Sequence, residues 1–158
     1  MNELAAAVRA VGLAFHADRC WLYARDPAAA QGIALVRWLR SPAVPDVPAD
    51  LRTWSAEAPD LPATDPLFAR ALAGEPLDAI ADVETAAVNR ELERALGHRA
   101  FVHVNLHAGG ELRGVLQPGM TAPRDWTAGE LAELAALRPS LAALLALDGS
   151  PPSHLLVG

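Results

Sequence analysis

The chain has no lysine and a single cysteine, and each absence excludes a class of chemistry. All 13 basic residues are arginine, so neither a lysine Schiff base nor phosphate binding by a P-loop lysine is available. Cys20 is the only cysteine, which excludes an intrachain disulfide, a CxxC redox motif and a zinc cluster. Any chemistry must therefore come from other side chains.

Long hydrophobic runs and an excess of basic residues are also missing. No apolar run approaches the ~20 residues that a membrane-spanning helix needs, and the first residues lack the basic flank and apolar core of a secretion signal. The formal net charge of −6 argues against nucleic acid and anionic membranes as partners. With the alanine- and arginine-rich composition of a GC-rich coding sequence, these features lead us to expect a soluble, cytoplasmic, bacterial protein.

Five segments have the alternation or the flanking turns of β-strands. The clearest is residues 99–107, in which aliphatic side chains alternate with polar and aromatic ones, the period of a strand. A Gly-Gly turn joins it to residues 111–117, and this second strand should stop at Pro118, because proline cannot donate to a ladder. The other predicted strands are residues 18–25, 31–40 and 76–80.

Four helices are predicted from their caps and apolar periodicity. The Asp-Pro pair at residues 65–66 can cap and open a helix that ends at Gly74. Thr127 and Glu130 form a capping box at the start of the last helix, which Pro139 should bend. The other predicted helices are residues 2–15 and 83–96.

One long irregular segment interrupts this pattern. Residues 41–64 hold five of the 13 prolines, and loops of this length are usually functional or mobile. A short helix near residues 49–56 is compatible with its sequence. At the other end of the chain, the Pro/Ser/Gly-rich residues 148–158 are expected to be a disordered tail.

Four segments, taken in order, resemble the GAF domain family, a small ligand-sensing module of signalling proteins. Residues 110–116 (GELRGVL) are similar to the family's strand motif, and residues 124–130 (RDWTAGE) to the start of its last helix. Residues 17–23 (ADRCWLY) resemble its first strand, and residues 72–77 (LAGEPL) its step from a helix to a short strand. The resemblance spans roughly residues 3–146.

The resemblance implies an α+β fold built on a single antiparallel sheet of about five to six strands. The N- and C-terminal helices would cover one face. The middle helices and the Pro-rich loop would cover the other and enclose a pocket. A PAS domain is the alternative fold, although its helices mostly fall between the second and third strands. We assign residues 1–147 to one GAF-like domain and residues 148–158 to the tail.

His103 and Asn105 are the most suggestive polar residues. They lie mid-strand beside Phe101, where apolar side chains are the default. If this strand lines the pocket, they supply hydrogen-bonding groups inside a mostly apolar cavity, with Trp54, Phe68 and Phe101 as further candidate ligand-binding residues. The alternative is a polar strand face turned to solvent.

The sequence predicts neither a metal site nor a catalytic site. His103 and His107 are four residues apart on one strand, about 13 Å at ~3.3 Å per residue, which is too far to share a metal ion. No GxSxG, HExxH or paired-carboxylate pattern stands out. A small enzyme of unrecognised type is therefore the last of three alternatives.

The resemblance implies a non-enzymatic sensory or regulatory domain. It would bind an unidentified small molecule and signal through its terminal helices to a protein in trans. Those helices would also form a homodimer. The second alternative is a ligand-free dimerisation or adaptor module, in which the pocket has been lost.

Three specialised branches of the family do not match this chain. The family's bilin-carrying photosensors attach their chromophore to a cysteine nearer the later helices, where this chain has none, so a covalent bilin is not expected. Reductases of free methionine sulfoxide need several cysteines. Cyclic-nucleotide-binding members carry an Asn-Lys signature, which a chain without lysine cannot have.

Overall fold

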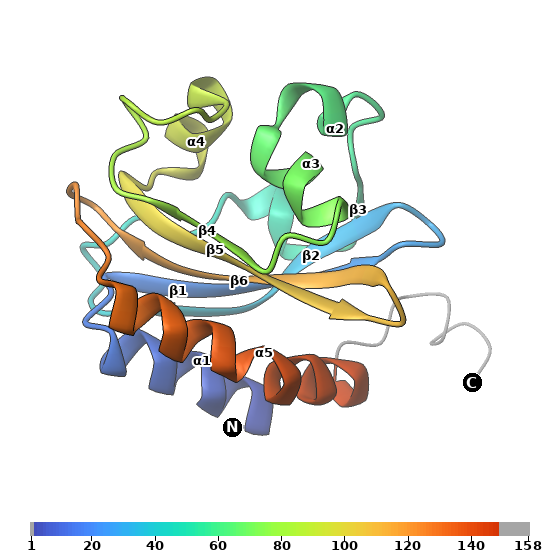
Figure 1. Ribbon diagram of the computed structural model, residues 1–158, viewed down its shortest axis with the longest axis horizontal. Coiled ribbons are helices and arrows are strands. Elements are labelled where there is room, and N and C mark those ends of the chain that lie inside the picture. Colours follow the sequence, from blue (N-terminus) through green and yellow to red (C-terminus); the bar gives the residue numbers. More distant parts are fainter. Residues whose placement is uncertain (1, 149–158) are drawn as a thin grey trace.

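Six antiparallel strands form one sheet at the centre of the protein, and helices cover both of its faces (Figure 1). The computed structural model describes residues 2–148. Across the sheet the strands follow the order β3-β2-β1-β6-β5-β4. Their bounds are Arg19–Asp26 (β1), Gln31–Leu39 (β2), Ser55–Ala56 (β3), Leu77–Ile80 (β4), Ala100–Ala108 (β5) and Glu111–Met120 (β6). The predicted α+β fold with a single antiparallel sheet is therefore confirmed.

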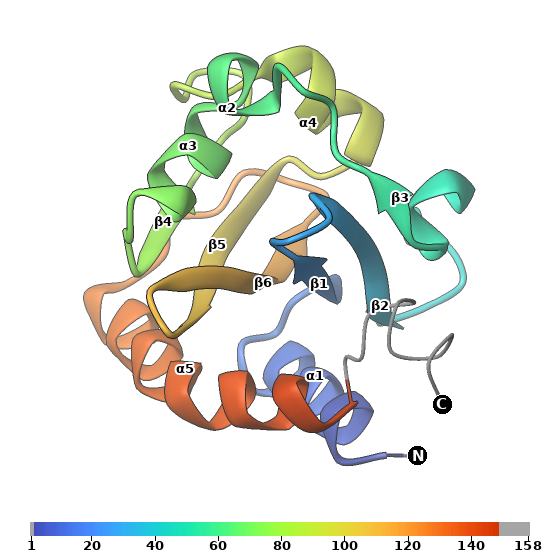
Figure 2. The same cartoon turned by 90° about the vertical axis from the view of Figure 1, so that its right-hand side faces the viewer.

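The first and last helices lie side by side on one face of the sheet (Figure 2). Asn2 Oδ1 accepts from the amide of Ala5 at 2.8 Å and so caps the first helix. The last helix begins with the predicted capping box, because the amides of Thr127 and Glu130 each donate to the other's side chain, at 2.9 and 3.1 Å. The two helices are α1 (Glu3–Ala14) and α5 (Ala128–Asp148).

The main core fills the space between these two helices and the sheet. Val102, Val104 and Leu106 of β5 point into it, as their alternation predicted. Leu4 of α1 and Leu134 of α5 meet them and are fully buried. Since burying an aliphatic side chain contributes about 1.5–3 kcal/mol, these contacts hold both helices against this face.

Short helices and the Pro-rich segment cover the opposite face, as predicted. Asp65 caps the central one through Oδ1, which accepts from the amide of Leu67 at 3.0 Å. The chain leaves that helix through Gly74, whose φ of 100° favours glycine. The helical elements on this face are η1 (Ala49–Arg52), α2 (Leu61–Thr64), α3 (Pro66–Leu72) and α4 (Arg90–Leu96).

The predicted helix over residues 83–96 is wrong in its first part, because α4 begins only at Arg90. Asn89 accepts through Oδ1 from the amide of Leu92 at 3.1 Å and caps the helix at that point. Asparagine side chains that bond a nearby amide favour caps over helix interiors. The helix therefore starts where this cap is available.

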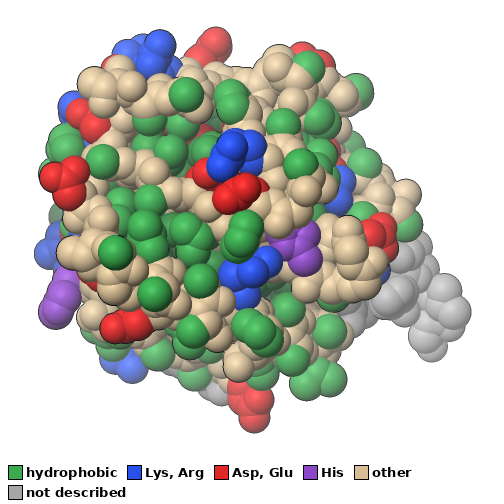
Figure 3. Space-filling model, viewed as in Figure 1, with side chains coloured by type: hydrophobic (Ala, Val, Ile, Leu, Met, Phe, Trp, Pro, Cys, Tyr) green, Lys and Arg blue, Asp and Glu red, His purple; other side chains and the backbone are tan. Residues whose placement is uncertain are grey.

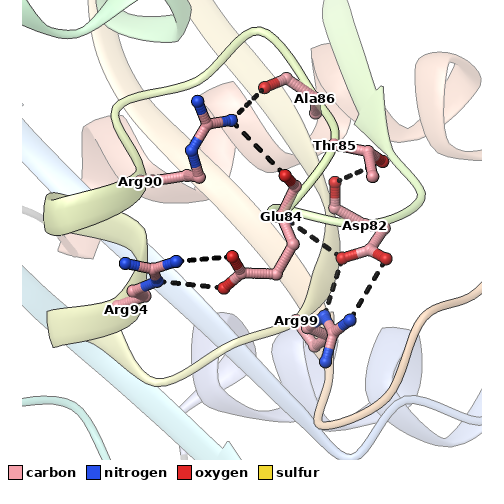
Figure 4. Close-up of polar contacts among 7 residues, drawn as sticks. All are labelled: Asp82, Glu84, Thr85, Ala86, Arg90, Arg94 and Arg99. Carbon is pink, nitrogen blue, oxygen red and sulfur yellow. Dashed lines mark hydrogen bonds and ion pairs between the residues drawn. The ribbon is translucent and has the colours of Figure 1, made fainter.

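The turns before α4 are held by ion pairs on the surface (Figure 4). The carboxylate of Asp82 accepts from the amide of Glu84 at 3.0 Å and from Arg99 at 2.6 Å. Glu84 in turn pairs with Arg94 of α4 at 2.6 Å. These contacts favour a turn over helix in residues 83–88 and tie α4 to the beginning of β5.

Strand β6 continues through Pro118, where the sequence predicted a stop. Its register pairs Phe101 with Gly119 and next Val104 with Leu116, so the ladder with β5 is open opposite the proline. A residue without an N–H fits there, because no hydrogen bond is lost.

Residues 41–64 contain two elements that the sequence did not predict. The expected short helix near residues 49–56 is present in its first half as the 3₁₀ helix η1. The two-residue strand β3 follows as the first unexpected element and places Ala56 opposite Gln31 at the sheet edge. Helix α2 is the second unexpected element.

The predicted disordered tail, residues 148–158, lies outside the described residues except for Asp148, which ends α5. None of the helices in the described part of the chain is long and apolar enough to cross a membrane.

Candidate ligand cavity

A cavity of about 150 Å³ lies on the face of the sheet that the short helices cover. Strands β1, β5 and β6 supply much of its floor, and η1, α2, α3 and α4 contribute to its wall. Most of its lining is apolar, with Trp21, Val47, Phe68, Leu96 and Val115 among the side chains. Its volume is close to that of an engineered cavity of about 150 Å³ that binds benzene, and lies below the ~300–1,000 Å³ of sites for drug-sized ligands.

Two charged side chains in the lining neutralise each other. Arg25 Nε lies 2.8 Å from Glu57 Oε2, and Arg25 Nη2 lies 3.0 Å from Glu57 Oε1, a bidentate pair. Asp65 is a further acidic residue of the lining, and burial, assisted by the nearby Glu93, raises its pKa to about 6. The described lining therefore offers no unpaired basic side chain to an anionic ligand.

His103 lines the cavity and is held from behind by Asn105. Asn105 is fully buried. Its Oδ1 lies 2.8 Å from His103 Nδ1, and its Nδ2 donates to the carbonyl of Glu75 at 2.8 Å. Burial lowers the pKa of His103 to about 4, so its ring is neutral at neutral pH.

Arg19 supports the cavity wall from within the protein. It is 1% exposed and donates to the carbonyls of Pro45 at 2.9 Å and Leu96 at 2.7 Å. Its guanidinium carbon lies 3.9 Å from the centroid of the Trp21 ring, a cation–π contact. The indole N–H of Trp21 is buried and has no hydrogen-bond partner among the described residues.

A buried acid–imidazole pair lies next to this wall. Glu93 of α4 hydrogen-bonds to Nε2 of His98, and the His98 ring stacks on Phe101 with centroids 4.0 Å apart. Burial raises the pKa of Glu93 and lowers the pKa of His98. Both shifts oppose the charged forms of the pair.

His107 joins the helices on the two faces of the sheet, at the end of β5. Arg138 of α5 donates through Nη2 to His107 Nδ1 at 3.1 Å and through Nε to the carbonyl of Asn105 at 2.8 Å. Since arginine can only donate, His107 Nδ1 accepts, and its Nε2–H donates to the carbonyl of Ala71 in α3 at 2.7 Å. We call this continuous connection between α3 and α5 the His107 bridge.

The structure brings together only part of the candidate set predicted from the sequence. Phe68 and His103 line the cavity, and Asn105 lies directly behind His103. Phe101 is buried in a neighbouring cluster with other apolar side chains. Trp54 packs against the main core and does not line the cavity.

Sequence reasoning missed the contribution of β1 to the lining. Trp21, Tyr23 and Arg25 alternate along the strand and all reach the cavity, whereas Cys20 and Leu22 belong to the main core. The alternation was available in the sequence. Both sets of residues are largely buried, however, so their spacing did not indicate which face holds the cavity.

A second hollow, of about 510 Å³, lies between α1 and α5. Its lining consists mainly of alanine and leucine, with Ala10 and Ala136 on its exposed rim. Leu13 of α1 is 50% exposed. We call this hollow the α1–α5 groove.

On the face shown in Figure 3, acidic and basic side chains are interspersed. Residues 2–148 contain no group of three or more His, Cys, Asp or Glu placed to hold a metal ion.

Known proteins resemble this chain along most of its length. The family model of the GAF domain matches residues 2–146. The GAF domain of PixJ from Thermosynechococcus elongatus, in its blue-light absorbing form, is 20% identical over 92% of this chain and 86% of its own, with a TM-score of 0.69. No curated protein matches the sequence.

Two further solved structures are similar. The GAF domain of an Acinetobacter phosphoenolpyruvate-protein phosphotransferase is 16% identical over 90% of this chain and 80% of its own, with a TM-score of 0.65. The phycoerythrobilin-bound GAF domain from a cyanobacterial phytochrome is 19% identical over 90% of this chain and 82% of its own, with a TM-score of 0.70. At these identities the similarity concerns the fold.

Proposed function

Because the chain belongs to the GAF domain family, we propose that it is a non-enzymatic regulatory domain that binds a small molecule in the central cavity and signals through its terminal helices. The family identification from the sequence is thereby confirmed, in place of the PAS alternative. GAF domains are generally sensory, ligand-binding modules rather than enzymes.

The observation that carries the proposal is the His107 bridge. A molecule in the cavity contacts Phe68 of α3, and the carbonyl of Ala71 in the same helix is bonded to His107. Movement of α3 therefore changes a hydrogen bond that continues through Arg138 to α5. A ligand that favours one position of α3 would shift the population of α5 positions.

The burial of the predicted polar pair supports ligand binding over the adaptor alternative. His103 is 7% exposed and Asn105 is fully buried, so neither belongs to a solvated strand face. A cavity is also present beside Phe68. An adaptor that had lost its pocket would have no reason to retain buried polar groups around an open space.

The ligand that we propose is smaller than the bilin of the phytochrome relative. A cavity of about 150 Å³ is too small for a linear tetrapyrrole. Cys20 belongs to the main core on the opposite face of the sheet, where it is fully buried and burial raises the pKa of its thiol. The residues of this chain therefore do not fit a covalently attached bilin.

We also propose that a second copy of the chain covers the α1–α5 groove. The groove is apolar, and one of its two helices, α5, is the helix that the His107 bridge reaches. Two copies related by a twofold axis could place the same surface against itself. Such a dimer would turn a shift of α5 into a change at a shared interface, which could act on a signalling protein in trans.

Native mass spectrometry of the protein purified from its own organism tests the binding step. A small molecule should be retained by the parent chain and lost in Val115→Phe, whose larger side chain fills the cavity. Hydrogen exchange in α5, with and without that molecule, tests transmission. Unchanged α5 exchange at saturation would reject the signalling role. Failure to retain or bind any small molecule would favour the adaptor.

A further inference from the structure

The hydrogen bonds of Asn105 determine the tautomer of His103. Asn105 Nδ2 donates to the carbonyl of Glu75 at 2.8 Å, which turns Oδ1 toward the imidazole. Because Oδ1 can only accept, the proton of His103 lies on Nδ1, 2.8 Å away. In the neutral ring, Nε2 is then the acceptor.

That acceptor is available to a molecule in the cavity. His103 lines the cavity, and its Nε2 has no hydrogen-bond partner within residues 2–148. Trp21 Nε1 is the only fully buried side-chain nitrogen or oxygen without a partner among the described residues, so His103 Nε2 is open to a small molecule. A ligand with an O–H or N–H group could donate to it.

The rest of the lining selects against anions and large size. Arg25 and Glu57 are bound to each other through two contacts, so neither offers a free charge. Trp21 and Phe68 supply aromatic surface, and the volume of about 150 Å³ suits one small ring. The unpartnered indole N–H of Trp21 adds a buried donor on the same side of the sheet.

We propose that the cavity selects compact, uncharged, phenol-like ring compounds, whose O–H or N–H group donates to Nε2 of His103. This inference rests on the proposed function, since it names the ligand class of the same cavity. It excludes phosphorylated nucleotides, for which the described lining has no free cation, and tetrapyrroles, which exceed the volume.

Phenol and toluene are a matched pair of probes, because they have nearly the same shape and differ in the donor. In an NMR titration of the full chain at pH 7, phenol should bind about tenfold more tightly than toluene. Anisole can accept but cannot donate, and should lack the advantage of phenol. His103→Leu should remove the preference for phenol and retain toluene binding, whereas Val115→Phe should abolish binding of all three.

A measurement without substitution gives an independent test. The ¹⁵N resonance of His103 Nε2 should shift when phenol saturates the protein and stay unchanged with toluene. Equal affinities for phenol and toluene, no binding of phenol, or a preference that survives His103→Leu would overturn the inference. If His103→Leu does not fold, an unmoved Nε2 resonance at saturating phenol overturns it alone.

The outcome can be separated from that of the proposed function. A charged or much larger molecule retained from the native organism would overturn this inference and leave the regulatory proposal standing. Phenol binding through His103 with no change in α5 exchange would support the ligand class and reject the signalling role.

Discussion

The guanidinium of Arg138 on α5 donates through Nε to the main-chain carbonyl of Asn105 on β5, at 2.8 Å. The side chain of the same asparagine orients His103 in the cavity. One buried residue therefore contacts both the binding site and the helix that we propose as the output. This arrangement makes the Asn105–Arg138 contact the most informative place to perturb the protein.

Replacing Arg138 by methionine keeps an apolar stem and removes the donors. The buried carbonyl of Asn105 and the ring of His107 each lose a partner, so the free energy of unfolding should fall by about 1–3 kcal/mol. Urea denaturation at pH 7 measures the change. Arg9→Met, at an exposed position on α1, is the control. Its free energy of unfolding should stay within about 0.5 kcal/mol of that of the parent chain. Similar losses in both variants would count against the bridge.

Glu93→Gln should be nearly neutral for stability, although it alters a buried acid. If Glu93 is protonated and donates to His98, a glutamine N–H can take over that role. The free energy of unfolding should then change by only about 0.5 kcal/mol. Glu93→Ala leaves His98 without its partner and should cost about 1–3 kcal/mol. Chemical denaturation at pH 7 compares the two, with the exposed Glu91→Gln as control. A loss of about 3–5 kcal/mol in Glu93→Gln would instead indicate a buried ion pair.

His103 should make the protein less stable in mild acid. Its pKa is lowered from 6.5 to about 4 in the folded chain, mainly by burial. As the pH falls below 6.5, the unfolded chain therefore takes up a proton that the folded chain refuses. The contribution of His103 to the free energy of unfolding is therefore complete above pH 6.5 and is smaller by about 2 kcal/mol at pH 5. His103→Gln should lose that much less between pH 7 and pH 5 in urea titrations. An equal loss in the variant would assign the effect to other groups.

The fold was largely predictable where the local sequence pattern, such as strand alternation or a helix cap, agrees with the burial of the same residues in the folded protein. Alternation along β5 placed Val104 in the main core and His103 on the other face, and the caps at Asn2 and Asp65 gave correct helix starts. Prediction failed at residues 83–88. There the helical spacing of apolar residues was overridden by local bonds of side chains to backbone amides.

The site was less predictable because it depends on contacts between distant segments. Glu57 enters the cavity lining only because β3 pairs with β2 at the sheet edge. A strand of two residues is too short to be predicted from alternation in the sequence. The partner of Arg25 was therefore invisible. Trp54 was chosen for its large ring in a long loop, but packing against the main core takes it elsewhere.

The α1–α5 groove makes dimerisation testable at one exposed position. Ala136→Glu adds a charge on the groove, and Ala132→Glu adds the same charge to an exposed part of α5 outside it. Both sites are exposed in the single chain, so the free energy of unfolding of each variant should stay within about 0.5 kcal/mol of that of the parent chain. Light scattering at micromolar concentrations should show a dimer for the parent chain and Ala132→Glu, and a monomer for Ala136→Glu, because a buried unpaired carboxylate is costly. A monomeric parent chain would refute the dimer, and a dimeric Ala136→Glu would place its interface elsewhere.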